Sequence, residues 1–129
     1  MDLAIKHIGI IHSSLKNLGD CPRQESENAP EARIQVYPEY ATAMKNLSVG
    51  DEIVLLTWLD KADRTILETH PRNDIAIPLA GVFSTRSPHR PNPIGLHQTK
   101  IVSVDSDGFT VAELEVLDKT PLLDIKPVI

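Results

Sequence analysis

One stretch of the sequence, Gly81 to Gly95, gathers side chains that can bind anions and the polar edges of ligands. Its polar members are mostly hydrogen-bond donors: Thr85, Arg86, Ser87, His89, Arg90 and Asn92. Arginine suits carboxylates and phosphates because its planar guanidinium can donate two parallel hydrogen bonds. The chemistry expected of this stretch is therefore recognition of an anionic or polar ligand.

Three prolines, at positions 88, 91 and 93, make the same stretch rigid. Each proline fixes its own φ and biases the preceding residue toward extended backbone, so neither an ordinary helix nor a central strand is expected. Apolar residues flank the loop on both sides: Val82, Phe83, Ile94 and Leu96. We expect both ends to be anchored in core strands. The alternative is a proline-rich linker, but linkers are seldom bracketed in this way.

The composition favours one acidic domain. The chain has 129 residues, of which 41% are hydrophobic, so we expect a single domain over residues 1–129. No apolar run is long enough to span a bilayer and no secretory signal is recognised, so we expect a soluble, cytoplasmic protein. The net charge of −5 argues against broad phosphate-backbone binding, although residues 64–100 carry five basic and two acidic side chains. That local excess of positive charge suits a small anionic ligand or a few phosphates.

Neither cysteine nor histidine spacing predicts a metal site. Cys21 is the only cysteine, which excludes an internal disulfide and a thiolate cluster. The five histidines lack the i, i+4 spacing of common metal sites: His7, His12, His70, His89 and His97. We therefore assign no metal ligand.

Alternating and β-branched apolar residues predict a mainly β protein. Strands are expected over residues 4–12, 32–37, 52–59, 96–105, 109–117 and 122–128, with a short one near residues 66–67. One helix is expected from Pro38 to about Gly50, and polar loops over residues 13–31 and 61–78. Closure removes exposed strand edges, so the expected fold is a small closed or nearly closed antiparallel β-barrel with one helix.

The strand over residues 52–59 should deliver Trp58 and Asp60 to a rim of the barrel. A buried core position is the default for the single tryptophan of the chain. Stacking on a base or sugar is the alternative for an aromatic residue at a strand end.

Two long motifs give the sequence a family resemblance. They are the loop itself, Gly81 to Leu96, and the C-terminal run from Leu117 to Pro127. Together with an opening Ile-Gly-Ile-Ile-His-Ser and the triplet Pro22-Arg23-Gln24, they resemble the TsaA-like family, whose best-known members are the TrmO tRNA methyltransferases. The resemblance covers essentially the whole chain.

This resemblance implies a β-barrel, a dimer, and S-adenosylmethionine bound near the subunit interface. It also implies methyl transfer to the exocyclic amine of a threonylcarbamoyl-modified adenosine beside the tRNA anticodon. The residues matched to the cofactor site are Pro22, Arg23, Gln24, Asp60, Arg86, Leu96, Leu117, Asp118, Lys119 and Thr120. Lys119 stands where the family commonly has glycine, and Val128 where it usually has an aromatic residue.

The acceptor amine of such a reaction is a weak nucleophile, because its lone pair is delocalised into the ring. The site must orient this amine and offer an acceptor for one of its N–H groups. Asn92 and Asp124 are our candidates, and loop bracing is the alternative role of each. Arg90 and Lys126 are assigned to the RNA substrate, with bracing of its own loop as the alternative for Arg90.

Alternatives stay open for the function and the assembly. The net charge of −5 motivates a second hypothesis, as does the absence from this sequence of the C-terminal extension that longer bacterial members carry. It is an S-adenosylmethionine-binding module or a small-molecule methyltransferase without tRNA activity. For the assembly we expect a twofold dimer whose interface lies beside residues 85–95 and the Asp118 turn. The alternative is a monomer whose own loop over residues 13–31 folds over the cofactor.

Overall fold

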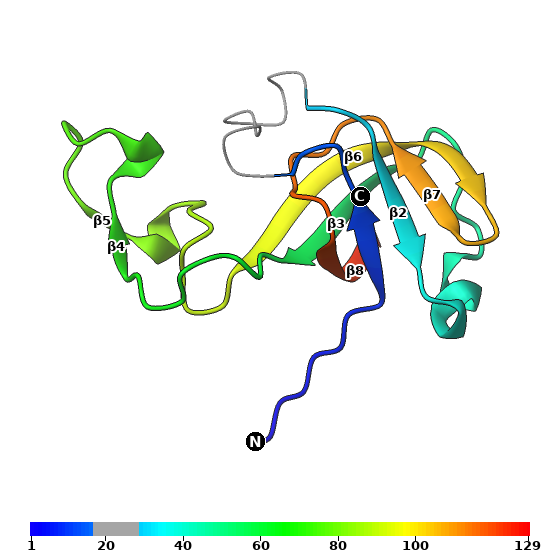
Figure 1. The fold of residues 1–129 in the computed structure, drawn as a ribbon, viewed down its shortest axis with the longest axis horizontal. Helices are drawn as coiled ribbons and strands as arrows, with labels where there is room; N and C mark the ends of the chain where they lie inside the picture. Colours follow the sequence, from blue (N-terminus) through cyan, green and yellow to red (C-terminus); the bar gives the residue numbers. More distant parts are fainter. Residues whose placement is uncertain (17–28) are drawn as a thin grey trace.

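The computed structural model of the chain describes residues 1–16 and 29–129. Its main feature is a six-stranded antiparallel β-barrel that closes in the order β1-β2-β7-β6-β3-β8 (Figure 1). The strands are β1 Gly9–His12, β2 Ala32–Val36, β3 Glu52–Trp58, β6 Ile94–Asp105, β7 Gly108–Val111 and β8 Thr120–Pro127. The closed barrel confirms the predicted fold class.

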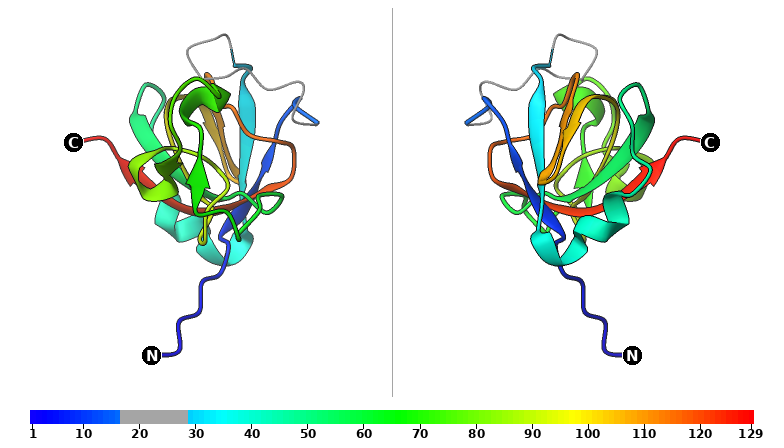
Figure 2. Two further views of the ribbon diagram at one scale, coloured as in Figure 1. Left: turned by 90° about the vertical axis from the view of Figure 1, so that its left-hand side faces the viewer. Right: turned by 90° about the vertical axis from the view of Figure 1, so that its right-hand side faces the viewer.

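Alternate side chains of the barrel strands fill its interior, as the pleat of a half-buried strand requires. In β3, for example, Ile53, Leu55 and Thr57 are buried and the residues between them are not. The buried apolar cluster includes Ile11, Ile34, Ile101, Phe109, Val111, Leu114 and Leu122. The views in Figure 2, turned by 90° from Figure 1, show the strands wrapped around this interior.

A second, two-stranded sheet stands apart from the barrel (Figure 1). It lies in residues 59–93, which connect β3 to β6 and which we call the arm. In the arm, β4 Glu68–Thr69 pairs with β5 Ala80–Gly81, and the short 3-10 helices η3 Pro71–Asn73 and η4 Val82–Ser84 flank the pair. At the base of the arm, the N–H of Leu59 donates to the carbonyl of Pro93 at 2.8 Å.

Several predicted strand boundaries were wrong. Two of these strands are shorter than predicted because their partner strand β2 covers only Ala32–Val36. The first strand covers Gly9–His12 and not residues 4–12, because its partner β2 ends at Val36, opposite Gly9. The strand after the hairpin turn ends at Val111 and not at 117, because β2 starts opposite that residue, at Ala32. The last strand runs from Thr120 to Pro127, and the short strand expected near residues 66–67 begins at Glu68.

The predicted helix and the predicted anchoring of the rigid loop also need correction. The helix is the 3-10 helix η2 Pro38–Met44, and the chain does not continue it to Gly50, since Asn46 adopts a positive φ of 79°. Of the apolar residues that flank the loop, only Val82 is buried. Phe83, Ile94 and Leu96 are 82%, 40% and 52% exposed. The first end of the loop therefore lies in the arm and not in a core strand.

Within the described residues, no helix has the length and apolar character needed to cross a membrane.

Candidate functional site

Asp118 fastens the turn before β8 to the segment that follows β1. Its backbone N–H donates to the carbonyl of Leu15 at 2.7 Å, and its Oδ1 accepts from the N–H of Ser13 at 2.9 Å. Lys16 Nζ lies 2.7 Å from Asp118 Oδ2. The hydrogen bond from Lys16, followed by that from Ser13, lowers the pKa of Asp118 from 3.8 to about 2. The carboxylate is therefore ionised at neutral pH, although its side chain is only 16% exposed.

Lys119, the next residue of this turn, adopts left-handed backbone with φ of 70°. Glycine takes up that conformation without strain, which explains why glycine suits this position of the motif. Lys119 Nζ lies 3.1 Å from His12 Nδ1, and His12 Nε2 lies 2.6 Å from Gln35 Oε1. An ammonium only donates and an amide oxygen only accepts, so these two contacts match the His12 tautomer whose hydrogen lies on Nε2.

The rigid loop is braced by its own side chains. Arg90 Nη1 donates to the carbonyls of Thr85 and Ser87, at 3.1 and 3.0 Å. The N–H of His89 donates to Ser87 Oγ at 3.3 Å. These contacts support the bracing alternative for Arg90. Arg86, by contrast, is exposed and forms no hydrogen bond or ion pair within the described residues.

Asn92 is linked to Arg64 at the base of the arm. Arg64 Nη2 donates to Asn92 Oδ1 at 3.2 Å, and Arg64 Nε donates to the carbonyl of Pro91 at 2.7 Å. The guanidinium carbon of Arg64 lies 5.1 Å from the centre of the Trp58 ring, a distance typical of a cation–π contact. Trp58 is half-buried at the end of β3. The tryptophan is therefore a rim residue and not a core residue.

A cavity of about 480 Å³ lies beside this cluster. Trp58, Arg64 and Asn92 line it, together with apolar side chains that include Leu3, Ile5, Ile94 and Leu123. Of the two predicted proton acceptors, Asn92 lines this cavity and Asp124 does not.

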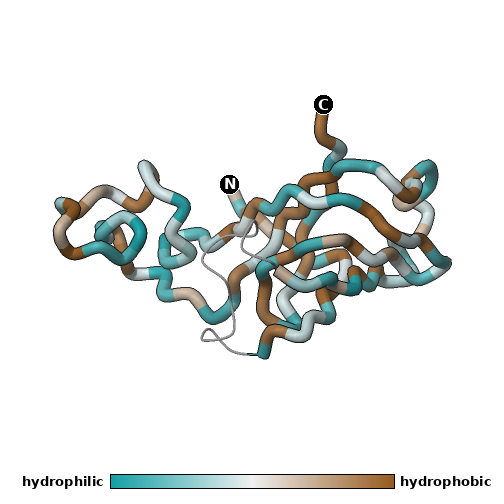
Figure 3. The backbone as a smooth tube through the Cα atoms, turned by 90° about the horizontal axis from the view of Figure 1, so that it is seen from above, coloured by the Kyte–Doolittle hydropathy of each residue, from teal (hydrophilic) through white to brown (hydrophobic). Residues whose placement is uncertain are grey.

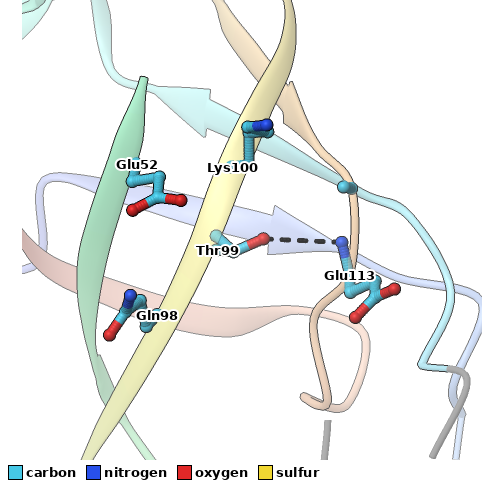
Figure 4. A pocket seen from close by; sticks show the side chains of 6 residues that line it. Glu52, Gln98, Thr99, Lys100 and Glu113 are labelled. Atoms are coloured by element: carbon cyan, nitrogen blue, oxygen red, sulfur yellow. Dashed lines mark hydrogen bonds between the residues drawn. The ribbon is translucent and has the colours of Figure 1, made fainter. Parts of the chain in front are cut away.

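A smaller cavity of about 320 Å³ lies between β3, β6 and the chain after β7 (Figure 4). Its lining side chains include Glu52, Gln98, Thr99, Lys100 and Glu113. The N–H of Glu113 donates to Thr99 Oγ1 at 3.4 Å. None of the residues predicted for the site lines this second cavity.

The predicted site residues form two groups in one chain. The first is the turn Leu117 to Thr120, held against β1. The second lies in the arm and at the start of β6, and comprises Asp60, Arg86, Arg90, Asn92 and Leu96. Within the described part of the chain, no hydrogen bond or ion pair joins the two groups.

The other predicted site residues lie elsewhere. Asp124 and Lys126 are exposed on β8, where the N–H of Ile125 donates to Asp124 Oδ1 at 2.8 Å and Lys126 Nζ lies 3.9 Å from Asp124 Oδ2. The triplet Pro22-Arg23-Gln24 and Cys21 lie outside the described residues. In residues 1–16 and 29–129, no three His, Cys, Asp or Glu side chains gather where they could hold a metal ion.

Sequence reasoning missed Arg64 and His12. Arg64 stands in a polar loop without any motif, and only its contact with Trp58 and Asn92 singles it out. His12 had a signal, since it belongs to the opening Ile-Gly-Ile-Ile-His-Ser segment of the family resemblance.

Comparisons with known proteins agree on one family. Residues 10–129 match the model of the tRNA-methyltransferase O N-terminal domain. A probable S-adenosyl-L-methionine-binding protein of Methanothermobacter thermautotrophicus is 36% identical over 127 residues, which cover 98% of this chain and 90% of that protein. Another, of Archaeoglobus fulgidus, is also 36% identical over 127 residues, but the match covers only 34% of that protein.

Solved structures show the same likeness. The crystal structure of TrmO from Pseudomonas aeruginosa aligns with a TM-score of 0.79 at 27% identity, covering all of this chain and 55% of that one. The chain thus spans about a third of the Archaeoglobus relative and about half of the solved TrmO chain.

Proposed function

The chain belongs to the tRNA-methyltransferase O N-terminal domain family, and from this membership we propose that it is an S-adenosylmethionine-dependent methyltransferase acting on tRNA. The proposed acceptor is the exocyclic amine of a threonylcarbamoyl-modified adenosine beside the anticodon. Three relatives that are 36–37% identical are described as established or probable S-adenosyl-L-methionine-binding proteins, which supports the cofactor. When bound, the cofactor supplies an electrophilic methyl group. A tRNA substrate also agrees with the cytoplasmic location that the sequence leads us to expect.

The observation that best supports cofactor binding is the fixed carboxylate of Asp118 in the turn before β8. S-adenosylmethionine carries positive charge on its sulfonium and its amino group. Asp118 is ionised, mostly shielded from solvent, and fixed by the backbone of Ser13 and Leu15. A carboxylate has about four lone-pair sites, so Asp118 can accept from a ligand amine in addition to its present partners. The residues of this turn therefore fit the cofactor.

Asn92 is the better of the two candidates for the acceptor of the amine proton. Its Oδ1 has a second lone pair beside the one that faces Arg64, and the residue lines the larger cavity. Asp124 faces its own strand, through its contacts with Ile125 and Lys126.

We propose that a second copy of the chain completes the site. The arm exposes large apolar side chains: Leu67 at 64%, Ile75 at 85%, Leu79 at 54% and Phe83 at 82%. In Figure 3 the arm, which stands apart from the barrel, carries brown, hydrophobic segments between teal, hydrophilic ones. Extended apolar patches mark interaction surfaces. A twofold dimer in which the arm of one copy covers the Asp118 turn of the other would join the two groups of site residues.

The test of the activity is mass spectrometry of tRNA nucleosides after incubation with the protein and S-adenosylmethionine. We expect one added methyl group on the threonylcarbamoyl-modified adenosine. A tRNA that lacks this modification is the matched control and should gain none. Absence of methyl gain on the modified tRNA would overturn the proposed activity.

The second candidate, a cofactor-binding module or small-molecule methyltransferase, is favoured by the net charge of −5. Phosphate contacts dominate RNA affinity and are strongest at low salt. Calorimetric titration with S-adenosylmethionine, alongside titration with tRNA at low salt, separates the two candidates. Tight cofactor binding without tRNA binding would favour the second one.

A further inference from the structure

The larger of these two cavities has the size and the mostly apolar lining of a small-molecule site. Its volume of about 480 Å³ falls within the range of roughly 300–1,000 Å³ that small-molecule sites occupy. Apolar side chains, among them Ile5, Ile94 and Leu123, line most of it, and His7, Arg64 and Asn92 supply polar groups. Such a lining suits a ligand with an apolar body that also carries a polar or charged group.

Arg64 is held in place but keeps its charge unpaired. A guanidinium has five N–H donors in a fixed plane. Nε–H goes to Pro91 and one Nη2–H goes to Asn92, which leaves three donors, including the fork between Nη1 and Nη2. Within the described residues, no carboxylate forms an ion pair with Arg64. The free fork has the geometry that binds a carboxylate through two parallel hydrogen bonds.

Trp58 gives the same cavity a stacking surface. The indole is half-buried and lines the cavity. The Arg64 guanidinium lies over it, with the guanidinium carbon 5.1 Å from the centre of the ring. Proteins commonly hold single unstacked bases of RNA on aromatic rings and on guanidinium planes. Here the guanidinium lies over the indole, and the pair forms one wall of the cavity next to a free carboxylate-binding fork.

We propose, resting on the function proposed above, that this cavity receives the acceptor nucleoside and that Arg64 determines its specificity. The base lies against the wall formed by Trp58 and the guanidinium over it, and the free Nη1–Nη2 fork of Arg64 binds the carboxylate of the threonyl group on N6. Adenosine without the substituent lacks this anion and leaves the guanidinium unpaired. Arg64 thereby selects the modified nucleoside over the unmodified one.

The single tryptophan makes the proposal directly measurable, because selective excitation of tryptophan reports only on Trp58 in the cavity. The full chain is titrated without cofactor with free N6-threonylcarbamoyladenosine, with its methyl ester and with adenosine. Excitation is set at the red edge of the tryptophan band, where adenine does not absorb. We expect the acid to bind at least tenfold more tightly than either neutral ligand.

Variants of arginine test the residue itself. In Arg64→Gln the preference for the acid over the methyl ester should vanish, and in Arg64→Lys it should shrink, because lysine keeps the charge but lacks the fork. Arg72→Gln, the same substitution at an exposed arginine of the arm, should keep the full preference. Circular dichroism checks that each variant is folded, and affinities rather than signal amplitudes are compared.

Equal affinity for the acid and its methyl ester, or an unchanged preference in Arg64→Gln, would overturn the proposal. The result is independent of the methyl-transfer assay. If the nucleoside preference depends on Arg64 but tRNA gains no methyl group, the activity fails and the binding site stands. If tRNA is methylated while Arg64→Gln still discriminates between modified and unmodified tRNA, the activity stands and the role of Arg64 fails.

Discussion

The barrel and the arm belong to one chain but bury their apolar residues to very different degrees. In the barrel, β3 pairs with β6 from Glu52 to Trp58 and with β8 on its other edge, whereas in the arm β4 and β5 pair over two residues each. The two phenylalanines show the contrast. Phe109 in the barrel is fully buried, and Phe83 in the arm is 82% exposed. The barrel closes its own edges and core, while the arm leaves large apolar side chains such as Phe83 exposed.

This difference divides the candidate site into a fixed half and an open half. The Asp118 turn is held by backbone hydrogen bonds, in which the N–H groups of Asp118 and Lys119 donate to the carbonyls of Leu15 and Ile11. The arm carries Arg86 without a partner in the described residues, and Arg64 with an unpaired fork. A ligand or a second copy therefore has more to order in the arm than in the barrel. Each of the following predictions tests that division.

The largest loss of stability is expected from a substitution in the core of the barrel. Phe109→Ala removes the largest fully buried side chain and should lower the free energy of unfolding by about 3–5 kcal/mol, the usual cost of a phenylalanine cavity. Urea titration of the variant measures it. Val104→Ala, at a position 40% exposed on the same hairpin, is the control and should cost much less. A loss below about 1 kcal/mol for Phe109→Ala would show that the barrel is not the rigid part.

The next effect is expected where the arm joins the barrel. A Cβ at Gly95 would overlap the hydroxyl of Thr57 and lie 2.7 Å from His97 Nε2, and these two side chains contact each other at 3.1 Å. Gly95→Ala should therefore lower the free energy of unfolding by about 2–3 kcal/mol, by overpacking and by disturbing a partly buried hydrogen bond.

Gly81→Ala is the matched control for that substitution. A Cβ at Gly81, in the arm, would meet no atom within 4 Å, and the residue has φ of −61°. Alanine should therefore be neutral or slightly stabilising there. Equal unfolding midpoints in urea for the two alanine variants would contradict the contrast between barrel and arm.

The same contrast decides what could be predicted from the sequence. The period-two alternation of residues such as Ile53 and Leu55 is a local property, so the strands and the closed barrel were predictable. Strand ends were not, because they depend on where the partner strand begins or ends, as at Gly9 and Val111. The exposure of Phe83 was also not predictable. The sequence beside a loop does not distinguish an apolar residue that packs in the core from one that stays on the surface.

The candidate site divides in the same way. The rigidity of the loop follows from its prolines, and the bracing role of Arg90 was one of two readings of the sequence. The roles of Asp118 and Arg86 came from matching motifs and stay predictions. Arg64 could not be found, because its neighbours Trp58 and Asn92 lie six and 28 residues away in the chain. Only the folded arm brings the three together.

In the open half of the site, Arg86→Lys should weaken binding of S-adenosylmethionine by about 2 kcal/mol, the value of a charge-assisted hydrogen bond. Lysine keeps the charge but cannot form the bidentate contact that the methionyl carboxylate would accept. Calorimetry measures the dissociation constant. Arg72→Lys, also exposed in the arm, is the control and should bind normally. An unchanged dissociation constant for Arg86→Lys would remove this residue from the cofactor site.

In the fixed half of the site, acid should weaken the hold on the Asp118 turn. The folded pKa of about 2 lies below the ordinary 3.8 of the carboxyl, so its contribution to stability is present above pH 3.8 and is lost as the pH falls toward 2. We expect the free energy of unfolding to fall by about 1 kcal/mol, because Lys16 is 63% exposed and solvent screens its ion pair with Asp118. Asp118→Asn and Lys16→Gln should both reduce this loss in urea titrations at pH 5 and pH 2.5. If the stability of the wild type and of Asp118→Asn depended on pH in the same way, the predicted role of the Asp118 carboxylate would be contradicted.

The smallest effect on stability, and the sharpest test of the arm, is expected from Phe83→Ala. The side chain is 82% exposed within one chain, so its removal should change the free energy of unfolding of that chain by less than about 0.5 kcal/mol.

If the arm packs on a second copy, the same Phe83→Ala substitution removes a large apolar contact from the interface. Light scattering at micromolar concentration should then give a mass near twice 14.3 kDa for the wild type and near 14.3 kDa for the variant. Val49→Ala, 65% exposed outside the arm, should leave the mass unchanged. A wild-type mass of one chain with cofactor present, or a dimer that survives Phe83→Ala unchanged, would mean that the exposed arm serves another surface.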